Sequence, residues 1–326
     1  MYSIKNLANV FFSCVTMVCA GSAAAQSTTA SSGQGFPVKP LRIVTNAPGA
    51  ASDFASRLIA QGLTESLGQQ VIVDNRGNLA GALASKAPPD GYTLVLDGTS
   101  FWIGPLLRKT AYDPLRDFSA VALVTSSPNI LVVHPSLPVR SVKDLIALAK
   151  ARPGELNYGT GTAGGSPHLA AALFSDMAGV SIVRIPYKGA GLAVNDLISG
   201  QVQLMFAIAA SVTGHVKSGR LRALAVTGEQ PSALFPGLPT VAASGLKGYE
   251  SVALQGVFAP LKTPAAIIER LNQDIVKYLA RADVKEKFFN AGTETVGGTP
   301  EQFASKVKSE ITRLGKVIRD AGIRDE

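Results

Sequence analysis

Strand-like and helix-like segments alternate along this chain, and this order constrains its fold more than any other feature. The apolar segment 41–46 (LRIVTN) predicts a buried strand, and 52–68 predicts a helix with apolar residues along one side. Strands at 70–75 and 92–97 follow, separated by small residues at 81–87 and a Pro-Pro-Asp-Gly turn. A strand–helix–strand order predicts the α/β class, with a mainly parallel sheet flanked by helices.

The same alternation starts again after residue 120. The elements expected in this second part are two strands within 120–136, a helix over 141–154, a strand at 155–161, a helix from Ser166, strands at 181–187, 201–208, 220–228 and 254–260, a helix at 193–200, and two long amphipathic helices at 264–292 and 300–322 with no strand between them. The repeat predicts two lobes, with the chain crossing near His134 and returning near Ser251. Ligands of such sheets bind at the carboxyl ends of the strands, so we expect the site in a cleft between the lobes.

The first residues have the pattern of a secretory signal peptide. Residues 1–25 carry one charge, Lys5, then a short apolar run, then three alanines that end at Ala25. The apolar run is shorter than the ~20 residues that span a bilayer, which disfavours a permanent anchor. We therefore expect cleavage after Ala25 and a periplasmic protein, with 26–36 as a Ser/Thr/Gly linker.

The composition excludes several kinds of chemistry. Both cysteines, Cys14 and Cys19, lie in the predicted signal peptide, so we expect no disulfide and no thiol chemistry. The three histidines are scattered and lack metal-ligand spacing, so we expect no metal. The net charge is +8, but Lys and Arg are spread along the sequence and aromatics make up only 6%, so nucleic acid is not an expected partner.

Two loops of small residues precede predicted helices. Loop 1 is residues 46–53 (NAPGAASD), and loop 2 is residues 160–168, the end of NYGTGTAGGSPH. Glycines let backbone amides approach a ligand, and a helix start attracts anions. We expect Ser52 or Asp53 to cap the first helix and Ser166 to cap the second, with Pro167 at the first helical position. The loops thus predict anion binding.

Gly159, Gly161 and Gly164 also match the G-x-G-x-x-G spacing of dinucleotide-binding loops. Such a loop should follow the first strand of its unit, and an acid should follow about 20 residues later to bind the ribose. Here the loop lies mid-chain, and the next strand offers Arg184 and no acid. We therefore expect no nicotinamide or other cofactor.

Several segments together resemble one family: VKPLRIVTNAPGAASDFASRLIAQGL, PPDGYTLVLDGTS, LNYGTGTAGGSPHLAAALF and IPYKGAGLAVNDLISGQVQLMF. In this order they resemble the tripartite tricarboxylate transporter substrate-binding receptors, the Bug family, from about residue 37 to the C-terminus. The resemblance implies a two-lobed periplasmic binding protein type II fold, with lobe 1 at 37–133 plus 252–326 and lobe 2 at 134–251. It implies a monomeric, non-catalytic receptor that closes on a small organic acid and delivers this carboxylate to a membrane transporter or presents it to a sensor protein.

In that family main-chain amides and ordered water hold the carboxylate. Carried over to this chain, the resemblance implies these ligand-binding residues: Pro48, Gly49, Ala50, Ala51, Ser52, Asp53, Thr99, Ser100, Thr160, Thr162, Gly164, Gly165, Ser166, His168 and Ala207. Asp53 either accepts amide hydrogen bonds or pairs with Arg57 at the helix start. His168 either touches the ligand or packs there, and Tyr187 and Lys188 either support the site or stay solvated.

The chain departs from the family pattern near this site. Ala50 and Ala51 stand where relatives usually have glycines, and Gly77 and Asn78 replace a proline and a glycine. These changes alter the pocket, so the ligand cannot be inferred from relatives. Two other function classes remain: a hydrolase using Ser166 and a nearby histidine, for which the sequence offers no third residue and no G-x-S-x-G elbow, and a scaffold with an inert cleft.

Overall fold

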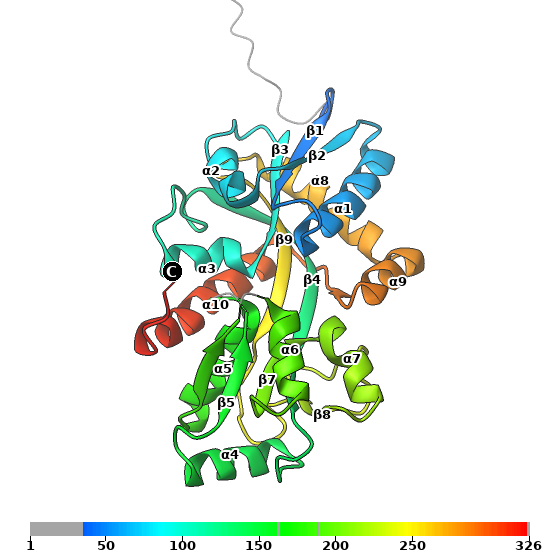
Figure 1. Cartoon of the computed structure of the whole chain (residues 1–326). Coiled ribbons are helices and arrows are strands. Elements are labelled where there is room, and N and C mark those ends of the chain that lie inside the picture. Colours follow the sequence, from blue (N-terminus) through cyan, green and yellow to red (C-terminus); the bar gives the residue numbers. More distant parts are fainter. Residues whose placement is uncertain (1–34, 162–163, 188, 325–326) are drawn as a thin grey trace, which may run out of the picture. The chain divides into compact units, whose positions relative to one another are not determined.

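The computed structural model describes residues 35–161, 164–187 and 189–324 (Figure 1). The predicted signal peptide, most of the linker, Thr162 and Lys188 lie outside the described residues. The strands are β1 (Leu41–Thr45), β2 (Val71–Asn75), β3 (Thr93–Gly98), β4 (Phe118–Val133), β5 (Asn157–Thr160), β6 (Val183–Pro186), β7 (Leu204–Ile208), β8 (Arg222–Val226), β9 (Val252–Pro260) and β10 (Glu294–Thr295).

The helices account for most of the remaining described chain. They are α1 (Ala51–Leu67), the 3-10 helix η1 (Gly77–Leu79), α2 (Ala80–Ala84), α3 (Thr99–Leu107), α4 (Val142–Ala151), α5 (Ser166–Ala178), α6 (Ala190–Ile198), α7 (Ala209–Lys217), α8 (Ala265–Leu279), α9 (Ala282–Asn290) and α10 (Pro300–Asp320).

The described strands form one sheet in the order β2-β1-β3-β9-β4-β7-β5-β6, and β8 and β10 also pair with β4. Pairing is parallel between β1 and its neighbours β2 and β3, and between β5 and its neighbours β6 and β7. Strands β4 and β9 are antiparallel to their partners. The α/β class is confirmed. The parallel pairing that we expected is found among the outer strands, whereas the two central strands depart from it.

The chain passes between the two parts of the sheet inside β4. We expected two strands here, but β4 is one continuous strand that pairs with β9 up to Pro128 and with β7 from Asn129 (Figure 1). Proline has no N–H to donate, so it suits a position where a strand changes partners. The chain returns where β9 begins at Val252. The exact lobe boundaries stay a prediction.

Two further expectations were wrong. The helix expected over 264–292 is two helices, α8 and α9, followed by the short strand β10. Arg281 breaks it with an extended backbone, and its guanidinium bonds to Glu65 at 2.9 Å and to Asp283 at 3.1 Å. Helix α3 was also missed, because its consecutive residues Phe101 to Gly104 are all buried and show no helical periodicity.

Helix α10 connects the two parts of the sheet. It packs against β4, against α3 and against α5. Its residues Phe303 and Val307 share a buried cluster with Trp102 of α3 and with Leu169 of α5. The elements that carry loop 2 and α3 are therefore held by one apolar core.

Candidate functional site

Loop 1 is closed by the side chain of Asp53. The amide of Gly49 donates to Asp53 Oδ2 at 2.9 Å, and Asn75 Nδ2 donates to Oδ1 at 2.9 Å. Arg57 lies 3.0 Å from Oδ1, so both roles that the sequence left open for Asp53 occur together. Burial by itself would raise the pKa of Asp53, but these hydrogen bonds and the Arg57 charge hold the pKa below its usual range.

Loop 2 repeats this arrangement with a different side chain. The amide of Gly164 donates to His168 Nδ1 at 3.0 Å, so the neutral ring carries its proton on Nε2. Burial, and then the nearby charge of Arg184, lower the pKa of His168 to about 4, which keeps the ring neutral. Gly49 (φ 79°) and Gly164 (φ 70°) both take the left-handed conformation that favours glycine.

The helix starts differ from the caps that we expected. The N-cap of α1 is Ala50 and that of α5 is Gly165, with nearly equal backbone angles (φ −68°, ψ 158° and φ −66°, ψ 159°) and no side-chain cap hydrogen bond. Ser166 and Pro167 therefore occupy the first and second helical positions. The first amides of an uncapped helix have no intrahelical acceptor, so they can donate to an anion.

A cleft of about 370 Å³ lies between loop 2 and the elements that follow β1, β2 and β3. Its walls are formed by Asn46, Gly77, Asn78, Gly81, Asp97, Ser100, Phe101, Gly104, Leu107, Arg108, Tyr112, Gly164 and Gly165. The starts of α3 and α5 both border it, whereas we expected those of α1 and α5. The N-cap of α3, Gly98, also lacks a side-chain cap hydrogen bond.

Asp97 is a buried acid in the wall of this cleft. The amide of Gly98 donates to its Oδ1 at 2.7 Å, and the Asn46 side chain also hydrogen-bonds to its carboxylate. Burial raises the pKa of Asp97 to about 6, although these hydrogen bonds and the charge of Arg108 oppose the shift. Sequence reasoning missed Asp97, because a polar residue at a strand end does not reveal its burial.

The cleft brings together only part of the predicted site. Ser100, Gly164 and Gly165 line it, and so do Gly77 and Asn78, where the chain departs from the family pattern. The other predicted residues that the structure describes lie outside its walls, and they are Pro48, Gly49, Ala50, Ala51, Ser52, Asp53, Thr99, Thr160, Ser166, His168 and Ala207.

Several polar side chains in and near this outlying set have structural partners. Thr99 Oγ1 accepts from the Leu254 amide at 3.0 Å, and Thr160 Oγ1 accepts from Arg184 Nε at 2.8 Å. Ala207 is fully buried within β7. Tyr187 hydroxyl donates to Asp196 at 2.7 Å. These contacts fix the strands and loops that border the cleft.

A larger pocket of about 690 Å³ lies between α5, β5, β6 and the end of α10. His168 and Arg184 contribute to its lining. The walls of the smaller cleft combine the residue after β1, the starts of α3 and α5, and loop 2. Both volumes fall within the 300–1,000 Å³ range of small-molecule sites, so volume does not distinguish the two.

Polar contacts stabilise the segments where the chain passes from one part of the sheet to the other. Asn129 Nδ2 donates to Ser166 Oγ at 2.8 Å, which ties the start of α5 to β4. Thr227 Oγ1 donates to the Ser251 carbonyl at 2.6 Å, and the Ser251 amide donates back to Thr227 at 2.9 Å. Asn129, Thr227 and Ser251 are all buried.

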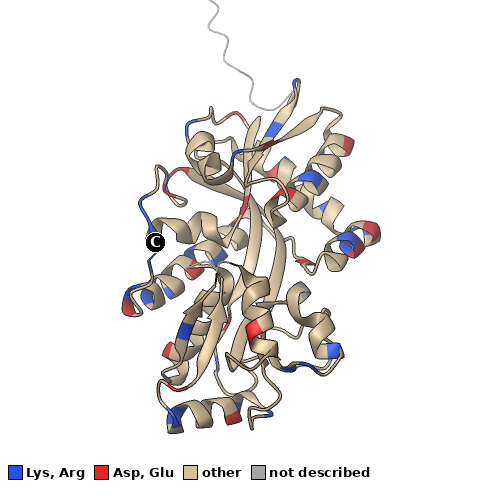
Figure 2. Ribbon diagram, in the orientation of Figure 1, with Lys and Arg blue, Asp and Glu red and all other residues tan. Residues whose placement is uncertain are grey.

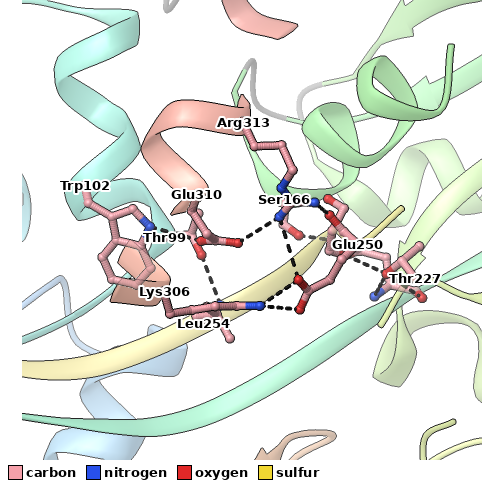
Figure 3. A network of polar contacts seen from close by, with 11 residues as sticks. Thr99, Trp102, Ser166, Thr227, Glu250, Leu254, Lys306, Glu310 and Arg313 are labelled. Carbon is pink, nitrogen blue, oxygen red and sulfur yellow. Dashed lines mark hydrogen bonds and ion pairs between the residues drawn. The ribbon is translucent and has the colours of Figure 1, made fainter. Parts of the chain in front are cut away.

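A second polar network runs along α10 (Figure 3). Trp102 Nε1 of α3 donates to Glu310 Oε2 at 3.1 Å, and Arg313 lies 3.4 Å from Glu310 Oε1. Arg313 also donates to the carbonyl of Glu250, whose carboxylate pairs with Lys306 at 2.6 Å. Burial raises the pKa of Glu310 to about 6, against the Trp102 hydrogen bond and the neighbouring cations. The network links α3, α10 and the segment that leads into β9.

The described residues offer neither a metal centre nor a membrane span. In residues 35–161, 164–187 and 189–324 no three His, Cys, Asp or Glu side chains are grouped to hold a metal ion, and no helix is long and apolar enough to cross a bilayer. Lys and Arg are distributed over helices and loops and intermixed with Asp and Glu (Figure 2).

The sequence is similar to a defined family over most of its length. Residues 55–323 match the family model of the tripartite tricarboxylate transporter family receptor, TctC. The chain is 38% identical over 311 residues to the UPF0065 protein in the tcbD-tcbE intergenic region of Pseudomonas sp. (strain P51), covering 92% of this chain and 93% of that protein. It is 36% identical over 297 residues to protein BugT of Bordetella pertussis, covering 89% and 91%.

Solved structures share the fold. Rpa4515 of R. palustris with adipate is 36% identical, with a TM-score of 0.70 over 89% of this chain and 99% of that chain. MatC from Rhodopseudomonas palustris with bound malate is 27% identical, with a TM-score of 0.66 over 87% and 100%. A TctC solute binding protein from Polaromonas has a TM-score of 0.81 at 25% identity, over 88% and 100%. The resemblance seen in the sequence is confirmed: this chain belongs to the tripartite tricarboxylate transporter receptor family, the TctC or Bug family of periplasmic solute-binding proteins.

Proposed function

We propose that the protein is a non-catalytic receptor that captures a small organic acid in the cleft beside loop 2. The observation that carries the proposal is the cleft itself, in which two helix starts without side-chain caps, those of α3 and α5, border one small space. Helix starts supply amide donors and a positive dipole end, and both favour a carboxylate. The related structures with adipate and with malate support a carboxylate ligand.

The proposal includes two lobes that close on the ligand. The movement would occur where the chain passes between the two parts of the sheet, inside β4 and at the start of β9. Leu107 of α3 and Gly164 of loop 2 both line the cleft, so ligand binding there depends on how the two segments approach. We further propose that the protein is exported after cleavage behind Ala25 and delivers its ligand to membrane subunits of a tripartite tricarboxylate-type transporter.

The contacts of Ser166 and His168 argue against the hydrolase alternative. Ser166 Oγ accepts from Asn129, and His168 Nδ1 accepts from the Gly164 amide. A nucleophilic serine needs a base that can take its proton, and here the Nδ1 lone pair is already committed to the loop. Ser166 and His168 therefore stabilise the conformation of loop 2.

Gly164→Ala tests the site, with Gly179→Ala as the matched control. Both glycines have positive φ (70° and 61°), so an alanine strains either backbone to a similar degree. A Cβ at position 164 would overlap Leu107 Cδ1 in the cleft wall, whereas a Cβ at position 179 meets no atom within 4 Å.

The measurement is calorimetric titration of the ligand-free protein with small mono-, di- and tricarboxylates. We expect the wild type and Gly179→Ala to bind at least one acid with similar affinity, and Gly164→Ala to bind it at least tenfold more weakly. Equal affinities in all three proteins would contradict the location of the site. Absence of binding by every acid would contradict carboxylate capture.

A further inference from the structure

The cleft proposed to bind a carboxylate ligand has a carboxylate side chain of the protein, that of Asp97, in its wall. Asp97 stands at the end of β3, its residue is 8% exposed, and it contributes to the cleft wall. A buried carboxylate is costly unless its environment or a partner compensates for the loss of water. The position of Asp97 therefore bears on which acids the cleft accepts.

We propose that Asp97 selects, among small organic acids, those that also carry a hydrogen-bond donor, a hydroxyl or an ammonium group. The inference rests on the proposed function, since it specifies the ligand of the same cleft. It makes Asp97 a specificity-determining residue that accepts a hydrogen bond from the ligand.

The hydrogen bonds of Asp97 leave room for this role. The Gly98 amide and the Asn46 side chain donate to its carboxylate, which as an ionised group offers about four acceptor positions. Asn46 itself lines the cleft, so the protein donors hold the carboxylate at the wall of the space that a ligand would fill. A ligand donor would add a charge-assisted hydrogen bond, which is stronger than a neutral one.

The charges of the cleft wall favour a ligand with two kinds of group. Arg108 and Asp97 both line the cleft, together with the neutral polar side chains of Asn46, Asn78 and Ser100. The charge of Arg108 already acts on Asp97, and a carboxylate of the ligand is attracted by the starts of α3 and α5. A second carboxylate directed at Asp97 would meet a like charge in a poorly solvated place, whereas a hydroxyl or ammonium group would meet an acceptor.

The alternative role for Asp97 is purely structural, as an acid next to the start of α3. An acid there interacts favourably with the helix dipole, but an exposed acid would do so without the cost of burial. Burial in a ligand cleft is the arrangement in which a polar group rejects analogues that lack its partner. The two roles differ in ligand preference, which can be measured.

The experiment compares matched acids of two chain lengths by calorimetric titration at pH 7.5, where Asp97 is ionised. The short set is succinate, malate and aspartate, and the long set is adipate, 2-hydroxyadipate and 2-aminoadipate. The proteins are the wild type, Asp97→Asn, and Asp90→Asn as a control with the same change of charge. Asp90 lies outside the cleft walls, with its side chain 41% exposed and paired with Lys39 at 3.7 Å.

We expect the wild type to bind the hydroxy or amino acid of at least one set ten or more times more tightly than the unsubstituted diacid. In Asp97→Asn the preference for the ammonium group, measured as the ratio of the affinities for the amino acid and the unsubstituted diacid, should fall at least tenfold. Asp90→Asn should keep the ratio of the wild type. Circular dichroism checks folding. If Asp97→Asn does not fold, the ratio of the wild-type affinities for the substituted and the unsubstituted acids still tests the proposal.

Two results overturn the inference while leaving the proposed function intact. One is a wild type that binds the unsubstituted diacids as tightly as their substituted analogues. The other is a folded Asp97→Asn protein that keeps the wild-type preference for the ammonium group, since the asparagine carbonyl can still accept from a hydroxyl but lacks the charge. A wild type that binds none of these acids instead overturns carboxylate capture, so the two failures are distinguishable.

Discussion

Asp97→Asn should stabilise the protein, and the gain should depend on pH. In the folded state burial raises the pKa of Asp97 from its ordinary value of 3.8 to about 6. The folded protein therefore holds this proton more tightly than the unfolded chain does. The favourable contribution of protonated Asp97 is fully present below about pH 4 and is lost as the pH rises through about 6.

The difference in pKa sets the size of the effect. At about 1.4 kcal/mol for each pKa unit, a rise from 3.8 to about 6 corresponds to roughly 3 kcal/mol of unfolding free energy in full. About 2 kcal/mol of this is lost between pH 4 and pH 7, because the unfolded side chain is already more than half ionised at pH 4. Asparagine has nearly the same shape and stays neutral, so the variant avoids this loss. Any difference in hydrogen bonding to Gly98 or Asn46 adds an offset that does not change with pH.

The assay is urea unfolding of the wild type, Asp97→Asn and Asp90→Asn at pH 4, 5, 6 and 7. Glu310, whose pKa is raised by burial to about 6, and His168, whose pKa is lowered by burial to about 4, also titrate in this range. Both are present in every variant, so they cancel in the differences. A stability difference between Asp97→Asn and the wild type that stays constant from pH 4 to pH 7 would refute the reasoning.

Two further predictions concern the α10 network and export. Arg313→Met should lower the free energy of unfolding at pH 7 by about 3 kcal/mol, because it removes the ion-pair partner of the buried Glu310 carboxylate. Lys316→Met, which breaks an exposed pair with Asp320, should change it by less than about 1 kcal/mol, and equal losses in a denaturant titration would contradict the network's role. For export, N-terminal sequencing of protein from the periplasmic fraction should begin at Gln26, and a sequence that begins at Met1 would contradict cleavage.

Strong local patterns were sufficient for much of the fold. The apolar strand 41–46 and the helix 52–68 were predicted within one residue of β1 and α1, because each has its own hydrophobic period. Patterns failed where tertiary contacts override local preference. Strand β4 continues through Ser126, Ser127 and Pro128 because β9 pairs with all three, and the helix of 264–292 breaks at Arg281.

In the candidate site too, local sequence patterns predicted some features, whereas others depend on tertiary contacts. The small residues of loops 1 and 2 marked two places where the backbone bends into a helix, and Gly49 and Gly164 do take the left-handed conformation there. The sequence did not reveal that each glycine amide binds the side chain four residues later, Asp53 or His168. Nor did it reveal that α3, with a start that no pattern predicted, forms a wall of the cleft.

The family, the α/β class and the two glycine loops could be predicted from the sequence, because hydrophobic periods, turn residues and a long series of matching segments are properties of neighbouring residues. Which side chains share the cleft, and which of them are charged there, depends on the packing of segments that are far apart in the chain. Asp97 precedes α3 and Arg108 follows it, whereas Asn46 and Gly164 come from distant parts of the chain. Burial and the pKa of Asp97 depend on what those segments bring together, and no local sequence pattern contains that information.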